Sequence, residues 1–319
     1  MTKEQPANIL EWANRSLDIR LWPTQAKLAL ETFGEWCPVC TDHHYWEHMP
    51  ASGGWRVSGV GPAFAQRVTK NGMEMFLTHV ALLEHGKCPK CGLERKQAIK
   101  TRHIQPIQEV LGFIGQRGGS TVLSVVLGTY LIHKLRQLGD IATAYGLIPE
   151  QQIEIAVIDD GGLGTLWDVL NEKIRHCLAD DQPEDPSVVF IDKSLVVRRY
   201  SAGNPDQLRG VTRVAALIDT LAWIDADADE ILAVLDNSLL TMRHESVDRD
   251  VPTPLLVALS SPRGNDDALA RRLVQKAGHK NVLKCCLPTW NINPHHIRDD
   301  FAKELQTPNG RRDYAIDLS

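Results

Sequence analysis

The sequence predicts an α/β fold in which a mostly parallel sheet is flanked by helices and carries a small metal-binding insert. Three observations predict it. Apolar runs of strand length alternate with helical segments. One such run leads into a glycine-rich turn, and two Cys-Pro-x-Cys pairs precede that turn. The chain has 319 residues, 43% of them apolar, which is enough for one large core or two moderate ones.

Charge and hydropathy narrow the classes of protein to consider. The formal net charge is −5, so any contact with nucleic acid must come from a local basic patch. The densest basic stretch is Glu94–His103, which suits either phosphate contact or a solvated helix face. Residues 1–20 are polar and charged, and the most apolar stretch, Thr121–Ile132, is too short to cross a bilayer. We therefore expect a cytoplasmic protein without a membrane partner.

The N-terminal residues Ile9–Leu30 predict one or two helices. Within them lies Leu21-Trp22-Pro23-Thr24-Gln25, where the proline after an aromatic residue marks a helix boundary. The amide of Gln25 matches the planar edge of a base, for which Trp22 offers an apolar platform. The alternative is an ordinary helix start with a surface glutamine.

Four cysteines predict a metal site. They are Cys37, Cys40, Cys88 and Cys91. In each Cys-x-x-Cys pair both sulfurs can reach one ion, and two pairs complete a tetrahedral zinc site of the ribbon type. The alternative is two buried cysteine pairs without a metal. With seven cysteines in all, an odd number, the pattern indicates a reducing compartment and not a disulfide framework.

The residues around the cysteine pairs add two expectations. The nearby His43, His44 and His48 could compete as ligands, but four thiolates already close a structural site, so they are expected at the surface or next to the ligating cysteines. Between the pairs, Gly53–Val68 and Gly72–Leu83 predict short strands separated by glycine turns.

The glycine-rich turn is Gly115-Gln116-Arg117-Gly118-Gly119-Ser120-Thr121. It follows the apolar run 110–114 and precedes a helical segment, 122–138. Strand, glycine turn and helix form the layout of a phosphate-binding loop, because backbone N–H groups and a helix N-terminus attract an anion. Compared with the pattern G-x-x-x-x-G-K-[ST], Ser120 replaces the lysine and Ile114 the first glycine. The alternative is an ordinary strand-to-helix turn.

Alternation of strands and helices continues to the end of the chain. The expected strands are 153–158, 187–191, 194–199, 212–220, 255–259 and 282–287, and the expected helices are 163–178, 228–242 and 266–277. Such alternation predicts βαβ units and a mostly parallel sheet.

Two of these strands end in polar residues that suit a phosphate site. Strand 212–220 is a continuous apolar run that ends at Asp219, as expected of a buried strand whose tip reaches a ligand. Val188–Asp192 is a rival strand that also ends in an acid. Strand 255–259 is followed by Ser260-Ser261-Pro262, which suits either a phosphate sensor or a simple turn.

Together and in this order, the segments resemble the large terminase subunit of tailed bacteriophages, the DNA-packaging motor, over residues 8–35 and 105–319. The resemblance is carried by Trp22–Gln25, by Gly115–Thr121 and by Leu208-Arg209-Gly210 ahead of Val214–Trp223. Ser260-Ser261-Pro262, Thr289–Pro294 and Arg312-Asp313-Tyr314 complete it. It implies a P-loop NTPase of the additional-strand type with ATP and Mg²⁺ as cofactors. The Zn²⁺ expected at the cysteines is predicted by their spacing and not by the resemblance. The implied partners are double-stranded DNA, a portal protein, a small terminase subunit and further copies of the chain in a ring, in the host cytoplasm.

The resemblance also implies roles for single residues and a division of the chain. Nucleotide binding falls to Trp22, Gln25, Gly115, Gln116, Arg117, Gly118, Gly119, Ser120 and Thr121, Mg²⁺ to Thr121 and Asp219, catalysis to Arg117, Asp219 and Thr220, and coupling to Ser260, Ser261 and Pro262. The expected parts are an N-terminal helical segment (1–34), a zinc-binding insert (35–100), a P-loop ATPase core (101–287) and a linker toward an absent nuclease domain (288–319).

The chain departs from the family pattern at two catalytic positions. Ser120 stands in place of the phosphate-binding lysine and Thr220 in place of the catalytic glutamate, while Lys134 lies about three turns along the helix, too far to substitute. The zinc insert is also unusual for the family. The alternatives to a packaging ATPase are therefore a terminase-like nucleotide- or DNA-binding scaffold without hydrolysis, or a zinc-ribbon nucleic-acid binder on an unrelated α/β domain.

Overall fold

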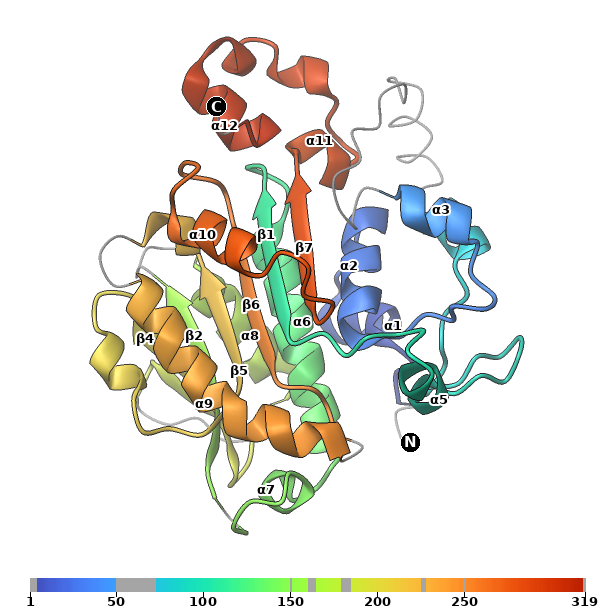
Figure 1. Cartoon of the computed structure of the whole chain (residues 1–319), viewed down its shortest axis with the longest axis vertical. Coiled ribbons are helices and arrows are strands. Elements are labelled where there is room, and N and C mark those ends of the chain that lie inside the picture. Colours follow the sequence, from blue (N-terminus) through green and yellow to red (C-terminus); the bar gives the residue numbers. More distant parts are fainter. Residues whose placement is uncertain are drawn as a thin grey trace.

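A computed structural model describes residues 5–49, 73–149, 151–159, 165–178, 185–224, 228–248 and 251–317. These residues form a seven-stranded sheet with helices packed on both faces, and the cysteine-containing segments lie beside α2 at one edge of the sheet (Figure 1). None of the helices in these ranges is long and apolar enough to cross a membrane.

From residue 110 onward, all seven apolar runs expected to be strands are strands. They are β1 (Glu109–Ile114), β2 (Ile153–Asp159), β3 (Val188–Phe190), β4 (Leu195–Ser201), β5 (Arg213–Asp219), β6 (Leu255–Ser260) and β7 (Val282–Leu287). The longer helices are α1 (Ile9–Leu17), α2 (Pro23–Phe33), α6 (Ser120–Arg136), α8 (Leu166–Cys177), α9 (Ala228–Asp248) and α10 (Ala268–Gln275). Shorter helices are α3 (His43–His48), α5 (Arg95–Lys100), α7 (Ile141–Ala144), α11 (Thr289–Ile292) and α12 (Pro308–Ala315), with 3₁₀ turns at Pro205–Leu208, Leu221–Trp223, Arg298–Phe301 and Glu304–Gln306.

The strand order is β3-β4-β2-β5-β6-β1-β7. Every neighbouring pair in this sheet is parallel except β3 and β4. Strand β6 lies between β1, which precedes the glycine loop, and β5, which ends at Asp219. This inserted strand is the defining feature of an additional-strand P-loop fold, so the expected fold class is confirmed.

The sheet topology decides between the two strands that end in an acid. Strand β3 runs antiparallel to β4, which is itself parallel to β2 and, through β2, to β5. Asp192 therefore lies at the end of the sheet opposite to Asp219. There its carboxylate accepts hydrogen bonds from the backbone N–H groups of Ser194 and Leu195 and shapes the turn into β4. Asp192 is a turn residue and not a rival ligand.

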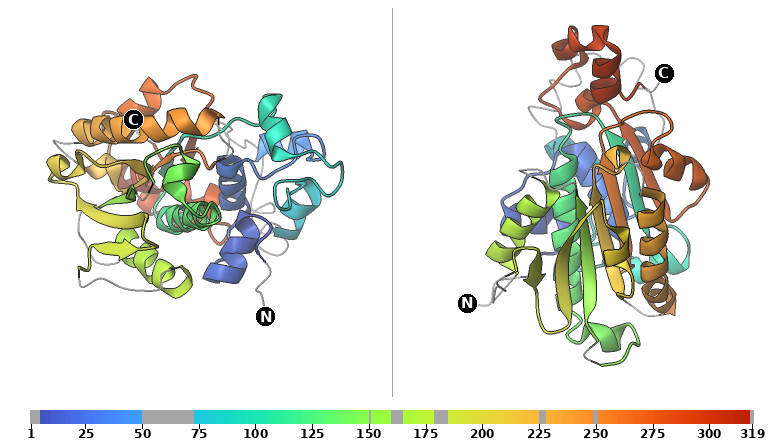
Figure 2. Two further views of the ribbon diagram at one scale, coloured as in Figure 1. Left: turned by 90° about the horizontal axis from the view of Figure 1, so that it is seen from below. Right: turned by 90° about the vertical axis from the view of Figure 1, so that its left-hand side faces the viewer.

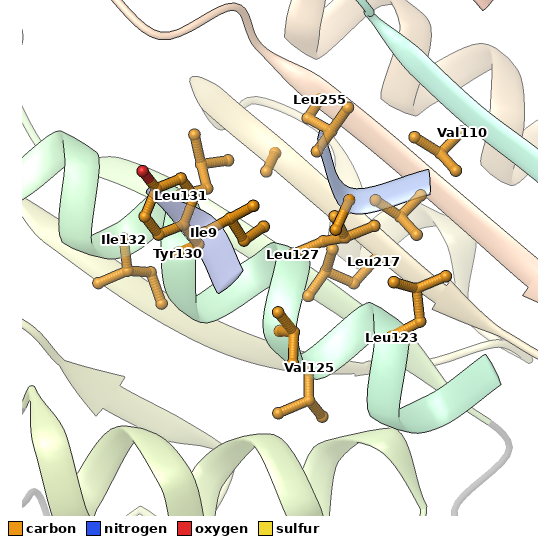
Figure 3. Close-up of a cluster of buried hydrophobic side chains, with 14 of the residues drawn as sticks. Ile9, Val110, Leu123, Val125, Leu127, Tyr130, Leu131, Ile132, Leu217 and Leu255 are labelled. Carbon is orange, nitrogen blue, oxygen red and sulfur yellow. The ribbon is translucent and has the colours of Figure 1, made fainter. Parts of the chain in front are cut away.

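Two hydrophobic clusters cover the two faces of the sheet. Helices α6 and α8 lie on one face, and α9 and α10 on the other (Figure 2). Successive side chains of a strand point to opposite faces of the sheet, so β5 contributes to both clusters. Leu217 belongs to the first cluster and Ile218 to the second. Helix α6 is buried along most of its length between α1, α2, α8 and the sheet (Figure 3), as expected of a helix that is apolar all round.

The expectation of short strands at Gly72–Leu83 is wrong. Residues 73–79 are helical, and only Leu82 forms an isolated bridge, to Trp36. The apolar residues recur at helical spacing, so that Phe76 and Val80 are buried while Leu77 is exposed. The expected strands at Gly53–Val68 lie outside the described residues.

A buried ion network joins β2, β4 and β5. Glu154 and Arg213 lie near the starts of β2 and β5, whereas the glycine loop follows the end of β1. The carboxylate of Glu154 accepts hydrogen bonds from Arg213 Nε (2.8 Å) and from the Tyr200 hydroxyl (2.8 Å). Arg213 is completely buried and also donates to the carbonyl of Leu208. Burying a charge away from water costs free energy, so the Glu154 carboxylate and the Arg213 guanidinium are each stabilised by the other.

We expect Glu154→Gln to lower the free energy of unfolding by roughly 3 to 5 kcal/mol, because it leaves the Arg213 charge buried without its partner. The matched control is Glu172→Gln, at a side chain that is 75% exposed, which should change it by less than about 0.5 kcal/mol. Denaturant unfolding of the three proteins measures both values. Equal stabilities for the two variants would contradict the role given to the network.

Candidate functional site

The glycine-rich loop lies between β1 and α6, at the end of the sheet where the parallel strands finish (Figure 1). It turns tightly, because the N–H of Gly118 donates to the carbonyl of Gly115 (2.9 Å). Arg117 and Gly119 both have positive φ angles, 64° and 76°. A glycine tolerates this conformation, whereas Arg117 must be held in it by its surroundings.

Every carbonyl of the loop from Gly115 to Gly119 accepts a hydrogen bond from the protein. The donors are Gly118 N to Gly115 O (2.9 Å), Thr289 Oγ1 to Gln116 O (2.8 Å), Asn293 Nδ2 to Arg117 O (2.9 Å), Gln25 Nε2 to Gly118 O (3.2 Å) and Leu123 N to Gly119 O (3.0 Å). The carbonyl dipoles are thereby held by protein donors. A loop whose carbonyls are satisfied in this way leaves its remaining N–H groups for an anion.

The N-terminus of α6 adds to this preference for an anion. Among the described residues, no side chain caps the helix, whose N-cap residue is Gly119. The first N–H groups of a helix have no partner within it, so those of Ser120, Thr121 and Val122 need an external acceptor. Ser120 and Thr121 are half-buried and Val122 is exposed. A phosphate is the acceptor that best fits unpaired N–H groups and the positive end of a helix dipole.

The sheet register brings Asp219 to the same end of the sheet. Asp219 lies opposite Leu259 on β6, and the next residue, Ser260, lies opposite Phe113 on β1, just ahead of the loop. The carboxylate of Asp219 accepts a hydrogen bond from Thr220 N (3.0 Å) and remains half-buried. A carboxylate and the hydroxyl of Thr121 are the oxygen ligands that Mg²⁺ prefers.

Lys134 does not reach the glycine loop, as expected from its place along α6. Its ammonium lies 3.9 Å from the carboxylate of Glu35 and over the ring of Tyr130, within the α1–α2–α6 packing. Thr220 has a left-handed backbone conformation (φ 56°). Its hydroxyl cannot act as a general base at neutral pH. Arg117 is the one charged residue of the loop, and its side chain is exposed.

Gln25 contacts the loop itself in this structure. Its side chain is 3% exposed, donates to the carbonyls of Gly118 and Gly119, and accepts from Trp22 N (3.1 Å). Trp22 is half-buried, with its ring 6.0 Å from that of His295. Contact between Gln25 and a base stays a prediction, while its contact with the loop was not predicted.

The predicted coupling residues connect to an aromatic–arginine cluster that the sequence did not reveal. Ser260 donates to the carbonyl of Ser261 (2.8 Å), and the indole N–H of Trp223 donates to the same carbonyl (3.2 Å). Trp223 is 41% exposed, with the guanidinium groups of Arg263 and Arg312 at 5.9 Å and 5.5 Å from its ring. Since these residues come from three distant segments, only the fold brings them together.

Thr289 and Asn293 were also missed as site residues, although both lie in the Thr289–Pro294 segment that carries part of the resemblance. Both are buried, and both donate to loop carbonyls. The segment that follows returns to the loop as well, because Gln116 N donates to the carbonyl of Asp313 (2.8 Å). Thr289, Asn293 and Asp313 therefore all contact the loop.

A second site lies at the four cysteines. The sulfur atoms of Cys37, Cys40, Cys88 and Cys91 all lie within 4.8 Å of one another, close to the separation of about 3.8 Å in a tetrahedral ZnS₄ centre. Two of them, Cys37 and Cys88, are buried and form a small hydrophobic cluster with Ala81 and Leu83. The four thiols could therefore hold a metal ion.

Three thiols of the cluster have shifted pKa values, and the shifts differ in direction. The pKa of Cys37 is raised, mainly by burial, and that of Cys40 is raised to about 12, mainly by its hydrogen bond with Cys91. Burial raises the pKa of Cys88, but hydrogen bonds from the backbone N–H groups of Cys91 and Lys90 outweigh it and lower the pKa to about 7. Gly92 has a positive φ of 77°, which lets the chain turn behind the sulfurs. As expected, His43, His44 and His48 are exposed, and none belongs to the cluster.

The inserted strand β6 and the glycine loop between β1 and α6 give the architecture of a P-loop fold of the additional-strand type. No model of a known protein family matches the sequence, and a search of characterised proteins finds no match either. Among solved structures, the chain is similar to the large terminase ATPase domain of Thermus phage P74-26, with 16% identity, a TM-score of 0.44 and coverage of 69% of this chain and 92% of that one.

Two longer structures are similar as well. The HK97 bacteriophage large terminase has 13% identity and a TM-score of 0.45, and the large terminase of a thermophilic bacteriophage, solved in complex with ADP, has 14% and 0.41. The match covers 65% and 66% of this chain but only 46% and 47% of theirs. At these TM-scores the likeness carries no argument about function, which is drawn below from the geometry of this chain.

Contact between Gln25 and Gly119 is testable by substitution. A Cβ at Gly119 would lie 2.6 Å from Gln25 Nε2, whereas a Cβ at Gly139, with nearly the same φ of 72°, would meet no described atom within 4 Å. We expect Gly139→Ala to cost about 1 kcal/mol for the left-handed backbone alone and Gly119→Ala to cost about 1 to 3 kcal/mol more.

Denaturant unfolding of both variants gives the two costs. The cost of Gly119→Ala should fall when Gln25 is already alanine, since the two side chains would otherwise collide. Equal costs at the two glycines, or no coupling with Gln25, would contradict the packing described.

Proposed function

We propose that the chain is the nucleotide-binding ATPase module of a DNA-packaging motor of the large-terminase type. The observation that carries the proposal is the glycine loop, whose carbonyls are all satisfied by protein donors at the uncapped N-terminus of α6. Asp219 is the last residue of β5, which β6 separates from β1, and it lies at the same end of the sheet as the loop. This combination suits the phosphates of a nucleotide and the divalent cation that accompanies them.

The proposed roles follow from the groups that each residue offers. The N–H groups of Gly119, Ser120 and Thr121 hold phosphate oxygens, and Thr121 Oγ1 and the Asp219 carboxylate hold Mg²⁺. When bound, Mg²⁺–ATP supplies a phosphoanhydride whose hydrolysis releases the energy for movement. Arg117, exposed and next to the phosphates, supplies the positive charge that Ser120 lacks.

Turnover by this site is expected to be slow. A group that stabilises charge in the transition state is worth on the order of 10²–10³ in rate, and both the lysine and the glutamate positions are substituted. The same two substitutions favour the second candidate, a terminase-like scaffold that binds nucleotide or DNA without hydrolysis. In either case we propose double-stranded DNA, a portal protein, a small terminase subunit and further copies of the chain as partners.

Steady-state phosphate release with duplex DNA tests the proposal. The chain is compared with Ser120→Lys/Thr220→Glu, which restores both groups and should turn over ATP at least about 10²-fold faster. Asp219→Asn should abolish Mg²⁺-dependent nucleotide binding, while Asp192→Asn, at the opposite end of the sheet, should leave it unchanged.

The outcomes separate the two candidates. DNA-stimulated turnover by the unsubstituted chain supports the motor. Turnover by the restored variant alone supports the scaffold, with a phosphate loop that has lost catalysis. If neither protein binds ATP, the assignment of residues 115–121 is wrong.

We also propose that the metal at the four cysteines is zinc, with a structural role. Four thiolates in two Cys-x-x-Cys turns match a closed zinc site without an open catalytic position. The apolar cluster that includes Cys37 and Cys88 is small, so the metal supplies much of the stability of this unit.

Metal analysis of the purified protein should find one zinc per chain. Cys88→Ser should lose the ion and the folded state of the cysteine unit, because serine is a poor zinc ligand. Cys286→Ser, at an exposed cysteine outside the cluster, is the control and should retain the full zinc content. Retention of zinc by Cys88→Ser, or its absence from the unsubstituted chain, would contradict the assignment.

A further inference from the structure

The second cysteine pair and α5 carry a concentration of positive charge. Residues 87–102 contain six lysines and arginines and one acidic residue, whereas the whole chain has 35 basic and 40 acidic residues. The segment therefore has a formal charge of +5, and the rest of the chain has −10. A segment of such opposite charge attracts polyanions locally while the remainder of the molecule repels them.

Most of these charges are at the surface and are not used within the fold. Lys87, Lys90, Lys96, Lys100 and Arg102 are exposed. Within the described part of the chain, the side chains of Lys87, Lys90, Lys100 and Arg102 form no ion pair. Because no ion pair within the described residues neutralises these four charges, they remain available to a partner.

Backbone hydrogen bonds hold the segment that carries these charged residues. The hairpin around Cys88 and Cys91 is joined to α5 by the bridge between Lys87 and Glu94 and by the hydrogen bond from Arg95 N to Gly86 O (2.8 Å). Arg95 differs from the other basic residues, because its side chain donates to the carbonyl of Phe33 (2.7 Å) and fixes α5 to α2. Because this backbone is already ordered, only the exposed side chains lose conformational freedom when they bind.

We propose that this surface, formed by Lys87, Lys90, Lys100 and Arg102, binds the phosphate backbone of duplex DNA. Duplex DNA presents one charge per ~1.7 Å along its axis, which matches separate charges spread over a surface. Residues 84–103 contain no Phe, Trp or Tyr on which unpaired bases could stack, so a single strand is a poorer fit.

The surface is separate from the nucleotide site. In Figure 1, α5 lies at the lower right, whereas the tips of β1 and β7 and helix α11 lie toward the top. The inference shares its partner, DNA, with the proposed function but does not depend on ATP turnover. The two can therefore fail independently.

The test measures binding of duplex DNA to the metal-loaded full chain. Fluorescence anisotropy gives the affinity over a range of salt concentrations. The variant is Lys90→Gln/Lys100→Gln/Arg102→Gln. The control is Lys193→Gln/Lys280→Gln/Lys303→Gln, which removes the same charge from exposed positions elsewhere. The first triple should weaken binding about tenfold or more and lower the slope of log K against log salt by about 2 to 3. The control should change neither.

Each outcome bears on the proposal. Retained zinc and an unchanged unfolding curve confirm that the first triple is folded. Equal losses in both triples would reflect net charge alone and overturn the proposal. So would an unchanged salt slope, no binding of duplex by the unsubstituted chain, or a loss confined to single-stranded DNA. Duplex binding through this surface without ATP turnover would retain the inference and remove the motor function.

Discussion

The structure depends on the hydrogen bonds that hold the carbonyls of the glycine loop. Three buried side chains, Gln25, Thr289 and Asn293, donate to successive loop carbonyls. These bonds fix which way each of the three peptides faces. The N–H groups at the start of α6 are thereby arranged for an anion without the lysine that usually assists them.

This constraint explains why segments far from the loop in sequence pack around it. Helix α2 supplies Gln25, and its neighbour Thr24 donates to the carbonyl of Asn291 (2.9 Å). The C-terminal residues supply Thr289 and Asn293 and then return with the carbonyl of Asp313. The side chain of Arg312, next in sequence, lies near Trp223. The loop and the tips of β5 and β6 are thus joined through one segment, residues 289–317.

The strands could be predicted from the sequence because a buried parallel strand is a continuous apolar run, and all seven runs from residue 110 onward are strands. Patterns could not decide between Asp192 and Asp219, since the direction of β3 follows from sheet pairing. Residues 73–79 were mispredicted because a short apolar segment fits both periodicities. The contacts of Gln25, Thr289 and Asn293 with the loop could not be predicted, because each joins residues more than 90 positions apart.

The hydrogen bond between Thr24 and Asn291 spans 267 positions, and that between Asn293 and Arg117 spans 176. Contacts of such separation form late in folding, because the chain between them must first be ordered. During synthesis, the loop cannot adopt its final shape until residue 293 has left the ribosome. A chain that stopped short of residue 289 would lack both Thr289 and Asn293, and two of the three side-chain donors to the loop carbonyls would be missing.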